Sequence, residues 1–362
     1  MGFSCGLVGL PNAGKSTIFN ALAHADARVE SYPFCTIEAK AGVVEVPDPR
    51  LDRLASLFPD KKKVPTHLEF IDIAGLVEKA SEGEGMGNAF LADIRSTDAI
   101  LHIVRCFEDG NVAHVTGSVD PQRDIEIVET ELLLKDLDTM TKVAKRLHQE
   151  TKGKDRTAPQ RAAAWDLLID HVAAGKPVRS ASRDRSIDSL IRDTALLTAK
   201  PCLFVANVGD SGENAWSTGV QRAAEERGSE AVCIRGRLEG EIGEVSATQE
   251  EKLTFLAEYG LEVTGLDALV RAGYRMLDLV TFFTMEGPEV RAWTVPAGTS
   301  AQLAGGKIHS DFSDHFVLAE VIDLDQLMDV GSEKLLREAG RIHRAGHDYV
   351  VSDGDVIHFI CA

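Results

Sequence analysis

The chain has 362 residues, enough for two or three domains with cores of their own. Its formal net charge of −18 excludes a protein that binds nucleic acid through a generally basic surface, although a local basic face is compatible with it. No apolar run is as long as a membrane span, and no signal segment opens the chain. Six scattered cysteines without a C-x-x-C pair favour a reduced chain, so we expect a cytoplasmic protein.

The most informative stretch is residues 5–17, CGLVGLPNAGKST. Gly9, four intervening residues and Gly14-Lys15-Ser16 match the phosphate-binding loop pattern G-x-x-x-x-G-K-[ST]. The glycines let backbone N–H groups turn towards phosphate oxygens. Lys15 brings positive charge to the β- and γ-phosphates, and the Ser16 hydroxyl is a ligand for Mg²⁺. The motif predicts a nucleotide-binding protein.

The residues around this loop have the pattern that the motif requires. Phe3–Val8 is short and mostly apolar, as expected for a buried parallel strand. Ser16–Ala23 is predicted to be a helix whose N-terminus faces the phosphates. The residues expected to contact the nucleotide here are Asn12, Ala13, Gly14, Lys15, Ser16 and Thr17.

A second phosphate-sensing element follows a strand predicted at Thr66–Ile71. The sequence there is D-x-x-G, in which Asp72 is expected to hold Mg²⁺ through water and the Gly75 N–H to meet the γ-phosphate. Thr36, in an irregular Pro-containing segment, is the natural third member, with its hydroxyl on Mg²⁺. The predicted metal-binding residues are therefore Ser16, Thr36 and Asp72.

The residue after this motif raises the question of how water is positioned. Leu76 stands where many GTPases have a glutamine that orients the attacking water, and leucine cannot make that hydrogen bond. His114, in the glycine-containing loop Cys106–Val119, is a candidate because neutral imidazole accepts a proton or a hydrogen bond. The alternative is a surface histidine with no role. The predicted catalytic residues are Lys15, Gly75 and His114.

Two long amphipathic helices, predicted at Asp124–His148 and Gln160–Ala174, separate two core strands and form an inserted hairpin. Residues 142–200 contain 13 Lys and Arg against 7 Asp and Glu, a net charge of about +6. This charge favours contact with an anionic surface such as RNA; a solvated helical face is the alternative. The shorter run Lys61–Lys63 is interpreted as solvated.

The base-specificity element is expected after the strand Pro201–Ala206. GTPases have N-K-x-D at this place, and Asn207 and Asp210 fit that frame, whereas Val208 replaces the lysine that packs over the base. The S-A-K element of GTPases is absent from residues 236–239. We therefore expect Asn207 and Asp210 to contact the base, with specificity for guanine weakened.

The C-terminal part is predicted to be a small domain of mixed sheet with one or two helices and no catalytic cluster. A glycine-rich loop is expected through Gly306-Lys307. The predicted strands are Thr281–Thr284, Glu289–Val295, Phe316–Val321 and Val350–Phe359.

Several of these motifs together resemble the YchF/Obg-like ATPases, a branch of the Obg group of P-loop switch proteins. The segments that carry the resemblance are Gly6–Thr17 (GLVGLPNAGKST), Tyr32–Thr36 (YPFCT), Asp72–Leu76 (DIAGL), Val104–Phe107 (VRCF), Glu289–Val295 (EVRAWTV), Gly306–Phe312 (GKIHSDF) and Asp353–Val356 (DGDV). The family usually has N-x-x-E at the base site, so Asp210 is a departure.

The resemblance implies an α/β fold: a P-loop G domain with a mainly parallel sheet, an inserted coiled-coil hairpin and a C-terminal β-grasp (TGS) domain. The implied domain bounds are 1–125 with 199–280, 126–198, and 281–362, respectively. It also implies a preference for ATP over GTP and association with ribosomes, through the large subunit or the whole particle.

We therefore expect a Mg²⁺-dependent, slowly hydrolysing switch ATPase that couples its nucleotide state to ribosome or RNA binding, with no DNA or membrane partner. One alternative is a GTPase of the same architecture, which Asp210 favours and Val208 opposes. The other is a binding module with negligible hydrolysis, which is compatible with the presence of Leu76 in place of the water-orienting glutamine.

Overall fold

The computed structural model describes residues 2–25, 41–73, 86–152, 155–182, 184–245, 249–261 and 263–362. The chain forms two compact units, Met1–Val44 with Glu69–Gly273, and Glu45–Leu68 with Tyr274–Ala362. The domain bounds derived from the sequence remain predictions. The second unit contains residues 45–68, which the sequence did not connect with the C-terminal part.

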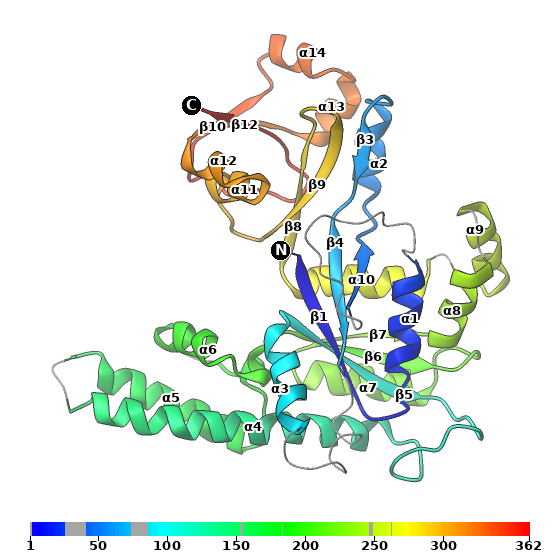
Figure 1. Cartoon of the computed structure of the whole chain (residues 1–362), viewed down its shortest axis with the longest axis vertical. Coiled ribbons are helices and arrows are strands. Elements are labelled where there is room, and N and C mark those ends of the chain that lie inside the picture. Colours follow the sequence, from blue (N-terminus) through cyan, green and yellow to red (C-terminus); the bar gives the residue numbers. More distant parts are fainter. Residues whose placement is uncertain are drawn as a thin grey trace. The chain divides into compact units, whose positions relative to one another are not determined.

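The first unit is built on a six-stranded sheet whose strand order is β2-β4-β1-β5-β6-β7 (Figure 1). The strands are β1 (Phe3–Val8), β2 (Ala41–Glu45), β4 (His67–Asp72), β5 (Ala99–Cys106), β6 (Cys202–Val208) and β7 (Glu230–Ile234). β1, β5, β6 and β7 pair in parallel. Every residue of β5 and β6 is buried, as expected for central parallel strands with both faces covered. This confirms the predicted α/β class with a parallel sheet.

Helices cover this sheet and bring their apolar faces into its core. Residues of α3, α4 and α7 pack with those of β5 and β6 in one cluster, while α1 packs against α8. The helices, apart from those of the insertion, are α1 (Lys15–Ala25), α3 (Met86–Ser96), α7 (Ala215–Glu226), α8 (Gly236–Val245), α9 (Gln249–Glu258) and α10 (Gly265–Met276).

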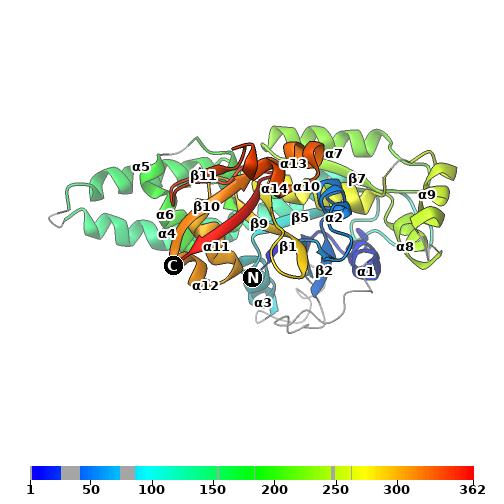
Figure 2. The ribbon, with the colours of Figure 1, turned by 90° about the horizontal axis from the view of Figure 1, so that it is seen from above.

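The predicted helical insertion is present between β5 and β6. Its two long helices, α4 (Pro121–Glu150) and α5 (Ala158–Ala173), lie side by side and reach beyond the sheet (Figures 1 and 2). The Asp120 side chain caps α4 by accepting from the Arg123 N–H, and Pro121 fits the first turn. The insertion has its own core around Trp165, which is fully buried and donates its indole N–H to the Met140 carbonyl at 3.1 Å.

The chain returns from the insertion through short helices that are anchored to α4. These are η2 (Val178–Ser180), η3 (Arg185–Ile187), α6 (Asp188–Thr194) and η4 (Leu197–Ala199). The buried Asp136 carboxylate of α4 accepts the backbone N–H groups of Leu197 and Thr198, each at 2.8 Å, and the Thr198 hydroxyl at 2.7 Å. The root of the insertion is thus fixed by hydrogen bonds as well as by apolar packing.

The second unit contains another six-stranded sheet, with the order β11-β10-β12-β8-β9-β3. Its strands are β3 (Lys62–Val64), β8 (Leu279–Thr284), β9 (Glu289–Pro296), β10 (Phe316–Ile322), β11 (His343–Ala345) and β12 (Val356–Cys361). β8 and β9 form an antiparallel hairpin, and β3 pairs with β9 in parallel. Its helices are α2 (Pro49–Ser56), α11 (Ala301–Ile308), α12 (Ser310–Asp314), α13 (Leu324–Val330) and α14 (Glu333–Glu338).

Two details of this unit correct the sequence-based expectations, and a third adds a strand that the sequence did not predict. The predicted glycine-rich loop is helix α11, where Gly305 allows close packing: a Cβ there would lie 3.1 Å from a ring carbon of Phe359. Lys62 and Lys63 of the lysine run are exposed, as predicted, but they lie on strand β3. The last strand begins at Val356, after a turn stabilised by the Asp355 carboxylate. Within the described residues, no helix is both long and apolar enough to cross a membrane.

Candidate nucleotide-binding site

The phosphate-binding loop joins β1 to α1, as predicted, and two of its positions require glycine. A Cβ on Gly9 would lie 2.4 Å from the Ile103 carbonyl oxygen of β5. Gly14 has φ +97°, and a Cβ there would lie 2.1 Å from the Asn207 side-chain nitrogen. The glycine spacing of the motif therefore reflects close approach of the loop to β5 and β6.

The Lys15 side chain is 7% exposed and lies within the loop. Its Nζ donates to the carbonyl oxygens of Gly9 at 3.2 Å and Leu10 at 3.0 Å. The ammonium group is thereby held at the mouth of the loop, where the motif requires a positive charge for the phosphates.

Ser16 and Asp72 come together from distant parts of the chain. The Ser16 hydroxyl donates to Asp72 Oδ2 at 3.2 Å, although the residues are 56 positions apart. The other oxygen, Asp72 Oδ1, is buried and makes no hydrogen bond within the described part of the chain. A hydroxyl and a carboxylate with a free oxygen are suitable ligands for Mg²⁺, which usually takes few ligands from protein and the rest from water and phosphate. These residues fit the metal ion that the motif implies.

Asn207 braces the loop from the end of β6. Its Nδ2 donates to the Ala13 carbonyl at 3.0 Å, and its Oδ1 accepts the Gly236 N–H at the start of α8 at 3.1 Å. The side chain is 4% exposed, so both hydrogen bonds are shielded from water. The predicted contact of Asn207 with the base stays a prediction, whereas its hydrogen bonds position the loop.

Of the other predicted residues of this region, Ala13 is 3% exposed, whereas Asn12, Ser16, Thr17 and Asp210 are exposed. Asp210 lies on the turn that follows β6, and Ser16 and Thr17 are exposed at the start of α1. Val208, in the place of the GTPase lysine, is 5% exposed and packs in the sheet core. Thr36 and Gly75, with Cys35 and Leu76, lie outside the described residues.

His114 lies near the loop, but its ring is engaged elsewhere. Its Nε2 is 2.9 Å from Asp124 Oδ2 in the first part of α4, and its Nδ1 is 2.8 Å from the Thr116 hydroxyl. The side chains of His114 and Asp124 are each 5% exposed. Burial raises the pKa of Asp124, while His114 and Arg123 act in the opposite direction. His114 is therefore not a solvated surface residue, and its role in orienting water stays a prediction.

Two contacts that the sequence did not predict connect this histidine loop to the nucleotide site. Asn12 has φ +62°, and its side-chain Nδ2 donates to the Ala113 carbonyl at 3.0 Å. The buried Arg105 at the end of β5 donates to the carbonyls of Phe107 and Val112, each at 3.1 Å. The sequence signal for these contacts was an arginine at the end of a mostly apolar strand, because a buried guanidinium must find hydrogen-bond acceptors nearby.

The fold and this site define a P-loop NTPase with a G domain: a glycine loop between strand and helix, the Lys-Ser pair of the motif, and a carboxylate from a neighbouring strand. Two family models match the chain. Residues 4–146 match a model described as 50S ribosome-binding GTPase, and residues 279–361 match YchF-GTPase_C, described as a protein of unknown function.

Full-length relatives extend the match to the whole chain. The Ribosome-binding ATPase YchF of Escherichia coli O157:H7 is 44% identical over 362 residues, and that of Bacillus subtilis (strain 168) is 44% identical over 365; both alignments cover 99% of each chain. The structure of the Schizosaccharomyces pombe YchF GTPase matches with a TM-score of 0.89 and 32% identity, covering 99% of this chain and 97% of that one. The chain belongs to the YchF family.

Proposed function

We propose that the protein is a Mg²⁺-dependent switch ATPase that binds ribosomes. The observation that carries the proposal is the Ser16–Asp72 hydrogen bond beside the phosphate-binding loop, with Asp72 Oδ1 buried and available to a cation. Ser16 and Thr36 would ligate Mg²⁺ and Asp72 would hold it through water. The ion would neutralise phosphate charge at the reaction centre.

The residues of the loop would perform the rest of the phosphate chemistry. Lys15 would exchange its two carbonyl partners for β- and γ-phosphate oxygens, and the loop N–H groups would hold the phosphates in place. The Gly75 N–H would detect the γ-phosphate. Because Leu76 cannot orient water, we propose that hydrolysis is slow until a partner acts.

Ribosome binding is supported by the names of the relatives and by the charge of the insertion. The E. coli and B. subtilis relatives are named ribosome-binding ATPases. Residues 142–200 of this region, with a net charge of about +6 on an acidic chain, would attract an anionic RNA surface. We infer that ATP reorients this insertion and a C-terminal TGS domain towards the ribosome. Co-sedimentation with ribosomes should depend on non-hydrolysable ATP; equal binding without nucleotide would remove the switch.

Direct titration with fluorescent ATP and GTP in the presence of Mg²⁺ tests the base preference. A clear ATP preference supports the proposal, because Val208 and the missing S-A-K element weaken guanine recognition. A clear GTP preference would establish the second candidate, a GTPase of the same architecture. The specific observation that favours it is Asp210, exposed after β6 where a GTPase aspartate reads guanine.

His114→Ala is expected to slow ATP hydrolysis by about 10²-fold and leave ATP affinity within about twofold, because general-base or water-orienting groups act on turnover rather than on binding. The matched control is Asp124→Asn, which disturbs the same buried pair but keeps the imidazole. Single-turnover phosphate release and urea unfolding would be measured for both. If the two variants lose similar stability in urea and similar turnover, His114 has a structural role rather than a role in orienting water.

A further inference from the structure

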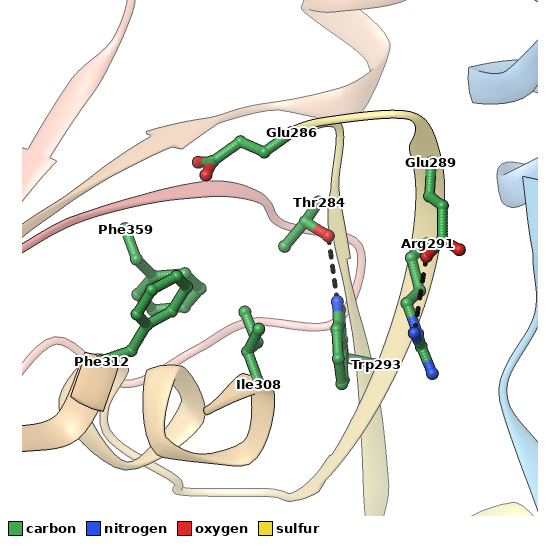
Figure 3. Close-up of a pocket in the computed structure, with 8 residues that line it drawn as sticks. All are labelled: Thr284, Glu286, Glu289, Arg291, Trp293, Ile308, Phe312 and Phe359. Atoms are coloured by element: carbon green, nitrogen blue, oxygen red, sulfur yellow. Dashed lines mark hydrogen bonds and ion pairs between the residues drawn. The ribbon is translucent and has the colours of Figure 1, made fainter. Parts of the chain in front are cut away.

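A cavity that the nucleotide site does not use lies in the second unit, between the β8–β9 hairpin, β12 and helices α11 and α12 (Figure 3). It encloses about 320 Å³. The side chains that line it are Thr284, Glu286, Glu289, Arg291, Trp293, Ile308, Phe312 and Phe359. A cavity of this size holds one side chain or a small ligand.

The wall of the cavity is aromatic and rigid. The rings of Phe312 and Phe359 pack with centroids 6.4 Å apart. Trp293 donates its indole N–H to the Thr284 hydroxyl at 3.0 Å, which fixes the ring plane. Arg291 stacks on this indole, with Cζ 4.4 Å from the ring centroid; Figure 3 shows Trp293 edge-on, with Arg291 on one side and Ile308 on the other. The indole thus contacts a guanidinium, stacks with the Phe282 ring at a centroid distance of 6.4 Å, and lines the cavity.

The rim is acidic. Glu289 lies 3.5 Å from Arg291, which compensates its charge, and Glu286 lies 3.0 Å from the His358 ring nitrogen. Burial raises the pKa of Glu286, and the nearby Glu333 acts in the same direction, whereas His358 and Lys61 oppose them. An additional cation would therefore stabilise the ionised carboxylate. The surroundings favour a cation too, because this unit, residues 45–68 and 274–362, contains 18 Asp and Glu against 12 Lys and Arg, a net charge of −6.

We propose that this cavity binds an arginine or lysine side chain of a basic polypeptide partner. The aliphatic stem would pack on Ile308 and Phe312, and the cationic head would lie against the Trp293 indole and pair with Glu286. RNA is disfavoured as an occupant because its phosphates would approach two carboxylates in an acidic unit. The proposal goes beyond the ATPase and does not depend on nucleotide binding.

Titration of the full-length chain with a short acetylated and amidated Gly-Arg repeat peptide tests this site. The fluorescence of Trp293 can be isolated by Trp165→Phe and Trp216→Phe, since the chain has three tryptophans, and calorimetry on the unmodified chain provides an independent affinity. Saturable quenching is expected. Glu286→Gln should weaken binding by about tenfold, as expected for loss of a close charge pair.

Asp348→Asn is the matched control, because it removes one negative charge from a side chain that is 92% exposed in the same unit. It should leave the affinity of the peptide within about twofold. Equal losses in the two variants would show that only net charge attracts the peptide and would overturn the site. Absence of saturable binding would also overturn it, as would tighter binding of an oligouridylate that Glu286→Gln strengthens. ATP turnover, measured in the same samples, tests the proposed ATPase separately.

Discussion

Lys15→Met is expected to reduce ATP hydrolysis by at least about 10²-fold and to weaken ATP binding. Methionine keeps most of the length of the side chain and removes the positive charge that stabilises the phosphates as charge develops in the transition state. Because Lys15 is 7% exposed, its charge acts in a site that is largely shielded from water, which increases its effect on a bound phosphate.

Single-turnover phosphate release and titration with a fluorescent ATP analogue measure the two effects of Lys15→Met separately. Lys334→Met is the matched control, because that lysine is 84% exposed and pairs only peripherally, at 3.9 Å, with Glu338. The control should retain wild-type turnover. Urea unfolding should show that Lys15→Met is folded. Turnover of Lys15→Met within about twofold of the wild type would contradict the assignment of this loop as the phosphate site.

The strand–loop–helix that carries the candidate nucleotide site was predictable from the sequence because its signals are local. An apolar run, glycines at fixed spacing and a Lys-Ser pair lie within 17 residues, and the strand–loop–helix context follows from them. The Ser16–Asp72 contact was predictable in type, since Asp72 ends strand β4 and Ser16 follows the neighbouring strand β1 through the phosphate-binding loop.

The features that the sequence did not predict depend on partners far away in the chain. Lys61–Lys63 reads locally as a solvated basic run, and Lys62 and Lys63 are exposed. They lie on a strand because β9, more than 200 residues later, offers an edge for pairing. The pairing of His114 with Asp124 likewise depends on where the loop crosses the start of α4. The local sequence pattern therefore indicates a helix, strand or loop, but it does not indicate which distant segment that element contacts.

A distant pair of this kind, Glu129 of α4 and Arg179 of η2, also joins the segments at the root of the insertion. Arg179 Nη2 donates to the two carboxylate oxygens of Glu129 at 2.9 and 3.0 Å. The side chains are 6% and 8% exposed, and they lie 50 positions apart in the sequence. Arg179 Nε and Nη1 are buried without a hydrogen-bond partner within the described part of the chain, so the pair is only partly satisfied.

Arg179→Met is therefore expected to lower the free energy of unfolding by about 3–5 kcal/mol, because it leaves the Glu129 carboxylate buried without its counter-ion. Replacing both residues, with Glu129→Leu and Arg179→Met, is expected to recover most of this loss, since burying two charges has a desolvation cost that an apolar pair avoids. Urea unfolding of the two single variants and the double variant gives the coupling energy directly.

The result distinguishes two ways of holding the insertion. A large loss that the double variant recovers means that the pair fixes which segments meet at the root, while apolar packing around Trp165 supplies the stability. A loss below about 1 kcal/mol in Arg179→Met would mean that water reaches Glu129, and the Asp136–Thr198 hydrogen bonds would then be the main polar anchor. Hydrogen exchange of α5 separates these cases, because only the first predicts faster exchange throughout that helix in Arg179→Met.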